Sequence, residues 1–261
     1  MLRTRVITAI VALAALGVVL FVIPPQATQV VIGLLILAGA WEWSGFLDLD
    51  SSLSRAIYVI LIALLCAAPL LIPGLAPILL QVALIWWFAA FIWTMFFPTP
   101  IPAAVRWVSG ALVLVPLYTA LVMLFSSYGP GYLLFGLVIV WAADGGAYFA
   151  GKRFGRVKLA PSISPGKTWE GVIGGLLLVV VLTIVAGNWA DISIAVLVPF
   201  CLAVAAISIV GDLTVSMFKR TAGVKDSGSM FPGHGGVLDR VDSVAAAAPL
   251  FALGIGWLGL V

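Results

Sequence analysis

Long apolar stretches follow one another along most of the chain, separated by short segments that contain Pro, Gly or polar residues. None of the stretches shows the sustained alternation of apolar and polar residues that is typical of a strand in a membrane barrel. A helix needs about 20 apolar residues to cross the hydrocarbon core of a bilayer. The pattern therefore predicts an all-α, polytopic membrane protein with nine spans, near residues 6–23, 28–47, 56–72, 76–97, 107–127, 131–150, 171–189, 192–211 and 243–260.

Two boundaries in this layout are open to more than one interpretation. The first stretch begins with basic residues, as a secretory signal does, but no Ala-x-Ala cleavage site follows it. Pro24 and Pro25 close it instead, so we expect an uncleaved first span. The weakest separation lies at Pro73-Gly74, where two spans could instead form one re-entrant unit.

The basic residues support nine spans. With nine, all 13 Lys and Arg residues fall on one side of the membrane, and the opposite loops carry only Asp191. One span more or fewer would scatter them. Because Lys and Arg accumulate in cytoplasmic loops, we expect a cytoplasmic N-terminus and a C-terminus outside. The basic residues are Arg3, Arg5, Arg55, Arg106, Lys152, Arg153, Arg156, Lys158, Lys167, Lys219, Arg220, Lys225 and Arg240.

Composition excludes several classes of protein. Hydrophobic residues make up 64% of the chain and charged residues 9%, with a mean hydropathy of +1.25. Soluble domains average about 45–50% apolar and about 25% charged residues. A soluble enzyme, a disordered chain, a nucleic-acid-binding domain and a soluble domain on a single anchor are all excluded. Cys66 and Cys201 lie far apart in apolar stretches and predict neither a disulfide nor a zinc site.

No soluble domain is left over, so residues 1–261 are expected to form one membrane-embedded unit. Residues 1–130 carry little specific signal, and residues 131–261 hold the unusual polar groups. Acids inside a span are costly and are candidates for function. Asp144, among small residues near the end of the sixth span, is expected to face a polar cavity, whereas Glu42, between two tryptophans, is expected to be an acid at the membrane interface.

The densest group of polar residues lies between 211 and 243. If the eighth helix continues past Asp212, then Asp212, Ser216, Lys219 and Arg220 share one face. Two acids, Asp239 and Asp242, lie three residues apart at the start of the ninth helix and so share one face. Between the helices runs a glycine-rich segment, 232–236, whose N–H groups could bind an anion. Carboxylates beside cations suit a polyphosphate carried by Mg²⁺; the alternative is a loop that binds anionic lipid headgroups.

A second polar segment, 151–170, contains Gly166-Lys167-Thr168, which looks like the end of a phosphate-binding P-loop. A P-loop needs Gly where Pro161 stands, so we reject that fold. Ser164, Lys167 and Thr168 can still reach a phosphate individually. Asp144-Gly145 also resembles the start of the alcohol phosphatidyltransferase motif, but the later aspartates of that motif are missing.

The residues from Ser216 to Asp242 resemble the signature of the phosphatidate cytidylyltransferase (CDP-diacylglycerol synthase) family. The matching pattern is Ser216-x-Phe218-Lys219-Arg220-x4-Lys225-Asp226-x-Gly228-x2-Phe231-Pro232-x-His234-Gly235-Gly236-Val237-x-Asp239-Arg240-Val241-Asp242. The segments 164–171 and 144–148 are similar to that family as well. One departure is Val215, where the family often has an acid.

The resemblance implies that CTP and phosphatidic acid react to give CDP-diacylglycerol and pyrophosphate, with Mg²⁺ required and a second cation such as K⁺ beside it. It also implies a homodimer in a bacterial inner membrane, with membrane lipids as neighbours and no nucleic acid as a partner. We expect metal ligands at Asp212, Asp239 and Asp144, catalytic roles for Lys219, Arg220, Lys225, Asp226, His234 and Asp242, and substrate contacts from Ser164, Lys167, Thr168, Ser216, Gly235, Gly236 and Arg240.

Two other classes of function fit parts of the sequence. A transporter or channel would explain a buried Asp144, but the polar residues gather on the cytoplasmic side and no internal repeat is present. A CTP-dependent polyprenol kinase could use the same cavity with a different nucleophile. Gly171 and Gly175 form a GxxxG pattern, which is weak support for a dimer face.

Overall fold

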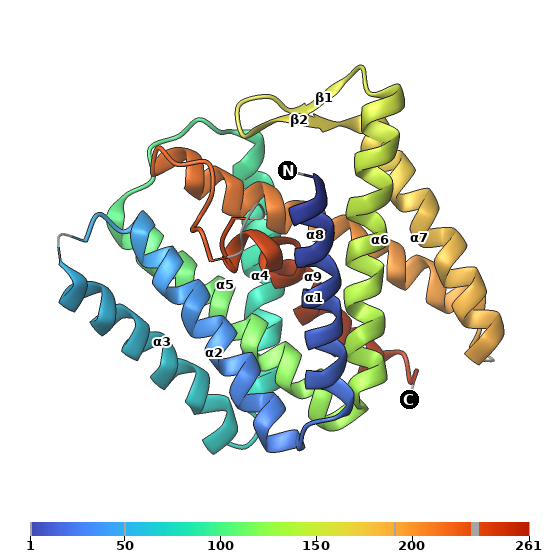
Figure 1. Cartoon of the computed structure of the whole chain (residues 1–261), viewed down its shortest axis with the longest axis horizontal. Coiled ribbons are helices and arrows are strands. Elements are labelled where there is room, and N and C mark those ends of the chain that lie inside the picture. Colours follow the sequence, from blue (N-terminus) through green and yellow to red (C-terminus); the bar gives the residue numbers. More distant parts are fainter. Residues whose placement is uncertain (1, 50, 191, 231–234, 261) are drawn as a thin grey trace.

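The computed structural model describes residues 2–49, 51–190, 192–230 and 235–260. Within these ranges the chain forms nine α-helices and one short hairpin (Figure 1). The helices are α1 (Leu2–Phe21), α2 (Pro25–Trp43), α3 (Ser52–Leu71), α4 (Leu75–Met95), α5 (Ala103–Met123), α6 (Pro130–Phe154), α7 (Trp169–Ala190), α8 (Ile194–Thr221) and α9 (Leu238–Trp257). The expected all-α architecture is confirmed.

Seven of these helices are long and apolar enough to cross a membrane, namely α2 to α8. In the first helix, the described segment Ile10–Phe21 is apolar and shorter than a span. The ninth helix is rich in Ala and is almost completely buried inside the protein. Nine helices therefore match the expected number, while seven have the length and hydropathy of a span on their own.

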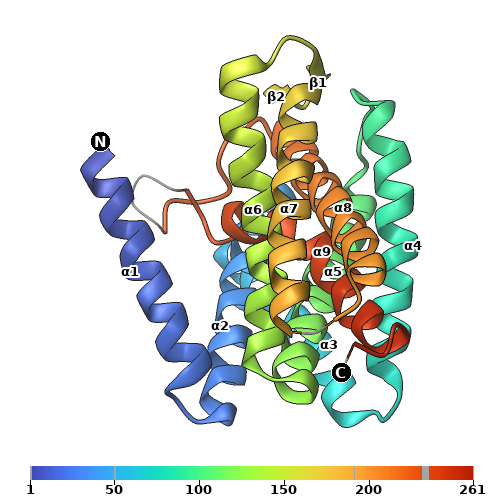
Figure 2. The same cartoon turned by 90° about the vertical axis from the view of Figure 1, so that its right-hand side faces the viewer.

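The helices run back and forth between two ends of the molecule. The N-terminus and the hairpin lie at one end, and the C-terminus lies at the other (Figures 1 and 2). The third and fourth helices are separate, joined by a turn at Gly74 whose φ of +80° suits glycine. Each helix is also long and apolar enough to cross a membrane alone, which favours two spans over the re-entrant alternative at Pro73-Gly74.

The ninth helix lies at the centre and packs against α4, α5 and α8, while α1 stands at the margin (Figure 2). Most of the fifth helix is buried as well. Aromatic side chains fill the space between α2 and α8, where the rings of Trp43 and Phe218 have centroids 5.0 Å apart. This core fixes the ends of α8 and α9, which carry most of the candidate residues.

Glycines bring α6 and α7 into close backbone contact. A Cβ placed on Gly146 would lie 2.9 Å from the Cα of Gly175, and one on Gly171 would lie 2.8 Å from the carbonyl oxygen of Ala147. Small residues permit such an approach between membrane helices. Gly171 and Gly175 are thus buried within one chain, so the reading of this GxxxG pattern as a dimer face is wrong.

The polar segment after the sixth helix is shorter and more ordered than expected. The sixth helix continues to Phe154, and a two-stranded antiparallel hairpin follows, with β1 at Lys158–Ala160 and β2 at Ser164–Thr168. Glu170, in the first turn of α7, accepts hydrogen bonds from the backbone N–H groups of Arg156 and Val157. These bonds hold the base of the hairpin against α7.

At the same end, Arg106 joins the fifth helix to the loop after α2. Its guanidinium donates to the carbonyl oxygen of Phe46 at 2.7 Å and to the carboxylate of Asp48. The hydrogen bond from Arg106 lowers the pKa of Asp48, which lies outside the membrane-spanning segments. The pair is exposed on the Asp48 side, so its contribution to stability is small.

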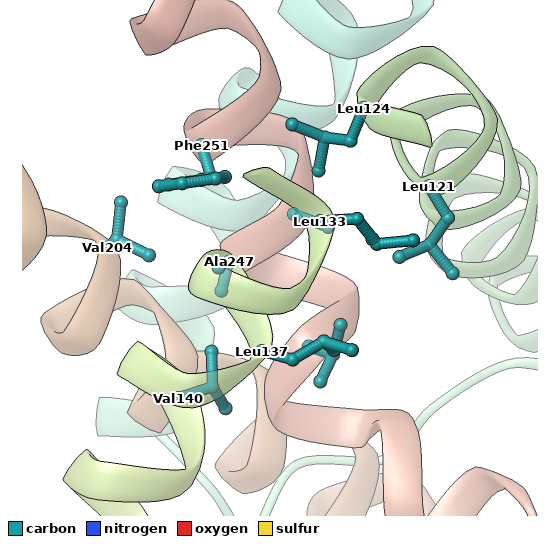
Figure 3. Close-up of a pocket in the computed structure, with 11 residues that line it drawn as sticks. Leu121, Leu124, Leu133, Leu137, Val140, Val204, Ala247 and Phe251 are labelled. Atoms are coloured by element: carbon teal, nitrogen blue, oxygen red, sulfur yellow. The ribbon is translucent and has the colours of Figure 1, made fainter. Parts of the chain in front are cut away.

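A small apolar cavity lies inside the bundle, between α5, α6, α8 and α9 (Figure 3). Its volume is about 10 Å³, which is room for little more than one water molecule. Leu133, Val140, Val204 and Phe251 are among the apolar side chains around it. The cavity offers no polar partner and no space for a lipid chain, so the functional site must lie elsewhere.

Candidate functional site

A larger cavity of about 620 Å³ lies next to the hairpin and is lined by residues of α6, β2, α7, α8 and α9. This volume lies within the usual range for small-molecule sites. Nine of the residues that the sequence singled out line it: Asp144, Lys167, Thr168, Asp212, Lys219, Asp226, Asp239, Arg240 and Asp242. Residues from three separate segments of sequence therefore meet at one place.

The eighth helix continues past Asp212 to Thr221, as the shared face of its polar residues requires. The hydroxyl of Ser216 donates to Asp212 Oδ1 at 3.0 Å, which confirms the spacing of four residues. Gly211 lets α9 approach closely, because a Cβ there would lie 2.9 Å from the side chain of Ala246. This contact places Asp212 beside the start of the ninth helix.

The hairpin carries Lys167 to the eighth helix. Its Nζ lies 2.5 Å from Asp212 Oδ2, and both side chains are about one-quarter exposed, at 25% and 26%. Thr168 is buried and its Oγ1 accepts a hydrogen bond from the N–H of Gly171 at 3.2 Å. Thr168 therefore fixes the junction between the hairpin and α7 as well as lining the cavity.

Lys219 links the eighth and ninth helices through two carboxylates. Its Nζ lies 2.7 Å from Asp239 Oδ1 and 3.9 Å from Asp242 Oδ2. The side chains of Lys219 and Asp239 are only 8% and 5% exposed. A buried ion pair needs further hydrogen bonds to offset the loss of water, and Asp239 has them.

The second oxygen of Asp239 accepts two backbone hydrogen bonds, from the N–H groups of Ser227 and Gly236, each at 2.9 Å. A carboxylate has about four acceptor positions, so three bonds leave one position on Asp239. Gly236 N–H is therefore taken by a carboxylate of the protein. This differs from the expectation that Gly236 would be open to a phosphate.

Glu42 differs most from its expectation. It is 7% exposed and lies inside the protein. Its carboxylate accepts hydrogen bonds from the N–H groups of Val237 and Leu238, at 2.9 and 2.8 Å, and from the hydroxyl of Ser227 at 2.9 Å. Glu42 is therefore not an acid that extends toward the lipid headgroups, because its carboxylate is bound inside the protein. No local signal pointed to this contact, because its partners lie 185 to 196 residues away in sequence.

Three acids on three helices, Asp144, Asp212 and Asp242, line the cavity. Asp144 of α6 and Asp242 of α9 both interact electrostatically with Asp212 of α8, and Asp144 also interacts with Ser243. Within the described part of the chain, no three Asp, Glu, Cys or His side chains form a preformed metal cage. Mg²⁺ does not need one, because it is commonly held by one or two carboxylates together with phosphate oxygens and water. The donor set fits that mode.

Several expected site residues do not line the cavity: Ser164, Ser216, Arg220, Lys225, Gly235 and Gly236. Arg220 is exposed and donates to the carbonyl oxygens of Ile163 and Val224, at 3.1 and 3.3 Å. It ties the hairpin turn to the eighth helix. His234 lies outside the described residues.

Three further residues that the sequence singled out are buried and do not line the cavity. Val215 is fully buried in the core and is not among the residues that line the cavity. Cys66 and Cys201 are buried and unpaired, as small hydrophobic residues are expected to be. Neither lines the cavity.

Comparison with known proteins gives a consistent result over almost the whole chain. The model of the cytidylyltransferase family matches residues 3–257. A phosphatidate cytidylyltransferase of Pseudomonas aeruginosa is 41% identical, with 97% of this chain and 96% of the relative covered. Those of Haemophilus influenzae and Thermotoga maritima are 37% and 35% identical, over 97% and 95% of this chain and 98% and 94% of theirs.

Proposed function

Since the chain belongs to the cytidylyltransferase family, and full-length relatives make it a phosphatidate cytidylyltransferase, we propose that the 620 Å³ cavity is where CTP and phosphatidate react. The observation that carries the proposal is the meeting of Lys167, Asp212 and Lys219 in one cavity. They come from a hairpin and a helix end that are far apart in sequence.

The reaction needs little activation of its nucleophile. A phosphate oxygen of phosphatidate attacks the α-phosphorus of CTP, the bond from that phosphorus to the bridging oxygen of the β-phosphate breaks, and pyrophosphate leaves with the electron pair. The barrier lies in bringing two polyanions together and in stabilising charge on the leaving group. Such transfers depend mainly on positioning and electrostatics.

Asp212 and Asp239 are the proposed ligands of Mg²⁺, with Asp144 beside them. Asp239 keeps one acceptor position, and Asp212 faces two neighbouring carboxylates that favour a bound cation. Bound Mg²⁺ would neutralise charge on the phosphates of CTP. Asp226 and Asp242 complete the acidic lining, and a second cation such as K⁺ rests on the family resemblance alone.

The cations of the protein are proposed to hold the phosphates. The ammonium group of Lys167, at 2.5 Å from Asp212, lies on the cavity wall and can turn toward a phosphate without moving the hairpin. Lys219 holds Asp239 in place and adds positive charge at the cavity wall. Arg240 is exposed at the cavity and is available to a substrate phosphate.

The orientation in the membrane is also a proposal. Arg55 and Arg240 lie in the first turn of α3 and α9, Arg106 lies near the start of α5, and Lys152 lies in the last turn of α6. In helices that run back and forth, these ends fall on the side of the hairpin that follows α6. The positive-inside rule then places this side, the cavity and the N-terminus in the cytoplasm of a bacterial cell, in its inner membrane. CTP would enter from the cytoplasm and the acyl chains from the bilayer; a homodimer rests on the family resemblance.

Labelled CTP tests the reaction directly. With purified protein, phosphatidate and Mg²⁺, label in the α-phosphate is expected in the lipid product and label in the γ-phosphate in pyrophosphate. Chelation of Mg²⁺ is expected to abolish both. Transfer of the γ-label to a lipid would identify a kinase, and absence of any labelled product would contradict a nucleotidyltransferase.

Lys167→Met tests the proposed phosphate contact. Loss of a hydrogen bond to a charged group costs about 1.5–3 kcal/mol, so kcat/KM for CTP is expected to fall by about 10- to 100-fold. Thermal stability should hardly change, because the ion pair with Asp212 is one-quarter exposed. Lys158→Met, on the other strand of the same hairpin and outside the cavity lining, is the matched control. Equal kcat/KM in the Lys167→Met and Lys158→Met variants would show that Lys167 does not contact CTP.

A further inference from the structure

The carboxylate of Glu42 extends from the end of the second helix to the start of the ninth. Oε1 accepts the N–H of Val237, and Oε2 accepts the N–H of Leu238 and the hydroxyl of Ser227. The residue is 7% exposed. Burial of a carboxylate is costly unless hydrogen bonds replace its water, and three short bonds do so here.

The charge of Glu42 is balanced by the ninth helix and by no side-chain cation within the described ranges. Val237 and Leu238 stand at the N-terminus of that helix, which is twenty residues long. The first N–H groups of a helix lack partners within it, and the helix dipole favours negative charge there. Glu42 therefore acts as a cap supplied from a different helix.

Glu42 and Asp239 share one partner. Ser227 donates its hydroxyl to Glu42 and its backbone N–H to Asp239. Together the two carboxylates accept the consecutive N–H groups of Gly236, Val237 and Leu238. The remaining oxygen of Asp239 accepts Lys219 Nζ at the cavity. A displacement of Glu42 would thus shift Ser227 and the start of the ninth helix, and with them Asp239.

Two glycines of the polar segment leave room for Glu42. A Cβ on Gly228 would lie 2.5 Å from Glu42 Oε1, and a Cβ on Gly236 would overlap the same carboxylate. Glycine is therefore required at both positions as long as Glu42 occupies this place. Ser227, Gly228 and Gly236 thus pack against the Glu42 carboxylate.

We propose that Glu42 is a positioning residue for cytidylyl transfer, which fixes the start of the ninth helix and so aims Asp239 at Lys219 and the cavity. The inference rests on the roles proposed above for Asp239 and Lys219. Glu42 does not line the cavity itself, so it acts on the substrates only through these residues.

Glu42→Gln is the first test. Glutamine keeps one acceptor oxygen and places an NH₂ group against a backbone N–H. Small misplacement of a catalytic group can cost up to about 100-fold in rate, and we expect kcat per folded protein to fall by about 30-fold or more. The KM for CTP should change by less than about threefold, because Lys167, the proposed phosphate contact, pairs with Asp212 and has no bond to Glu42 or Asp239. Amide exchange should accelerate at residues 236–238 and stay unchanged in the fifth helix.

Two further variants separate positioning from loss of stability. Asp48→Asn makes the same chemical change just beyond the second helix, in an exposed pair with Arg106, and should keep kcat within about twofold. Glu42→Gln added to Asp239→Asn should lower kcat little beyond Asp239→Asn alone, because residues that act through one another are not additive. If the fold-loss in kcat of the double variant equals the product of the fold-losses of the two single variants, the inference is overturned.

Other outcomes are also decisive. If Asp239→Asn is inactive while Glu42→Gln keeps kcat within threefold, the inference about Glu42 is wrong and the proposed site stands. If Asp239→Asn is fully active, the proposed site is wrong and the inference falls with it. Should Glu42→Gln not fold, Ser227→Ala, which removes one of the three bonds, is expected to lower kcat by about 3- to 10-fold; unchanged kcat would overturn the inference.

Discussion

Replacement of Asp212 by asparagine is expected to lower kcat of the purified enzyme by about 100-fold or more at saturating CTP and Mg²⁺. Asp212 is the acid that interacts with both Asp144 and Asp242 and that binds Lys167. Removal of one preorganised electrostatic group from an active site commonly costs about 10²–10³ in kcat. The measurement is transfer of α-labelled CTP to phosphatidate in detergent micelles.

The fold should survive this change. Asparagine keeps a side-chain oxygen that can still accept from the Ser216 hydroxyl, so thermal unfolding in detergent should shift by only a few degrees. Asp48→Asn again serves as the carboxylate control. Activity of Asp212→Asn within threefold of the unchanged enzyme would show that the proposed assignment of the metal ligands is wrong.

Lys219→Met is expected to have the largest effect on stability. Its ammonium group is the cation between Asp239 and Asp242, and all three side chains are almost fully buried, at 8%, 5% and 12% exposed. Loss of one partner from a buried ion pair leaves an uncompensated charge and costs about 3–5 kcal/mol. We expect a marked loss of folded protein, measured as a fall in the free energy of unfolding in detergent, and no detectable turnover.

A double variant identifies the cause. Lys219→Met combined with Asp239→Asn removes both charges of the closest pair, so it should recover part of the stability that Lys219→Met loses. It should recover none of the activity. Equal stability of the single and double variants would mean that the loss comes from packing of the lysine stem and not from the buried carboxylate.

The sequence was sufficient to predict the helices and one face of the site. Apolar stretches of span length gave nine helices in the right places, and the spacing from Asp212 to Ser216 correctly placed both on one face of α8. These inferences are local, because they depend on residues within one helix. The hairpin was missed, since strands of three and five residues have no pattern long enough to recognise.

Contacts between distant segments explain the errors. Glu42 lies between two tryptophans, a pattern typical of a membrane interface, and only the packing of α2 against the start of α9 shows its buried partners. The glycine-rich segment was expected to offer free N–H groups, but Gly236 donates to Asp239. A sequence shows that donors and acceptors exist; it does not show which ones are already paired.

The close contact that glycines allow between the sixth and seventh helices affects how the site residues can move. Gly146, Gly171 and Gly175 bring the two backbones so close that a side chain at any of the three positions would clash with the facing helix. The sixth helix carries Asp144 and the seventh anchors the hairpin with Lys167. Because α6 and α7 pack this closely, we expect Asp144 and Lys167 to shift together whenever the helix pair moves relative to Asp212 on α8.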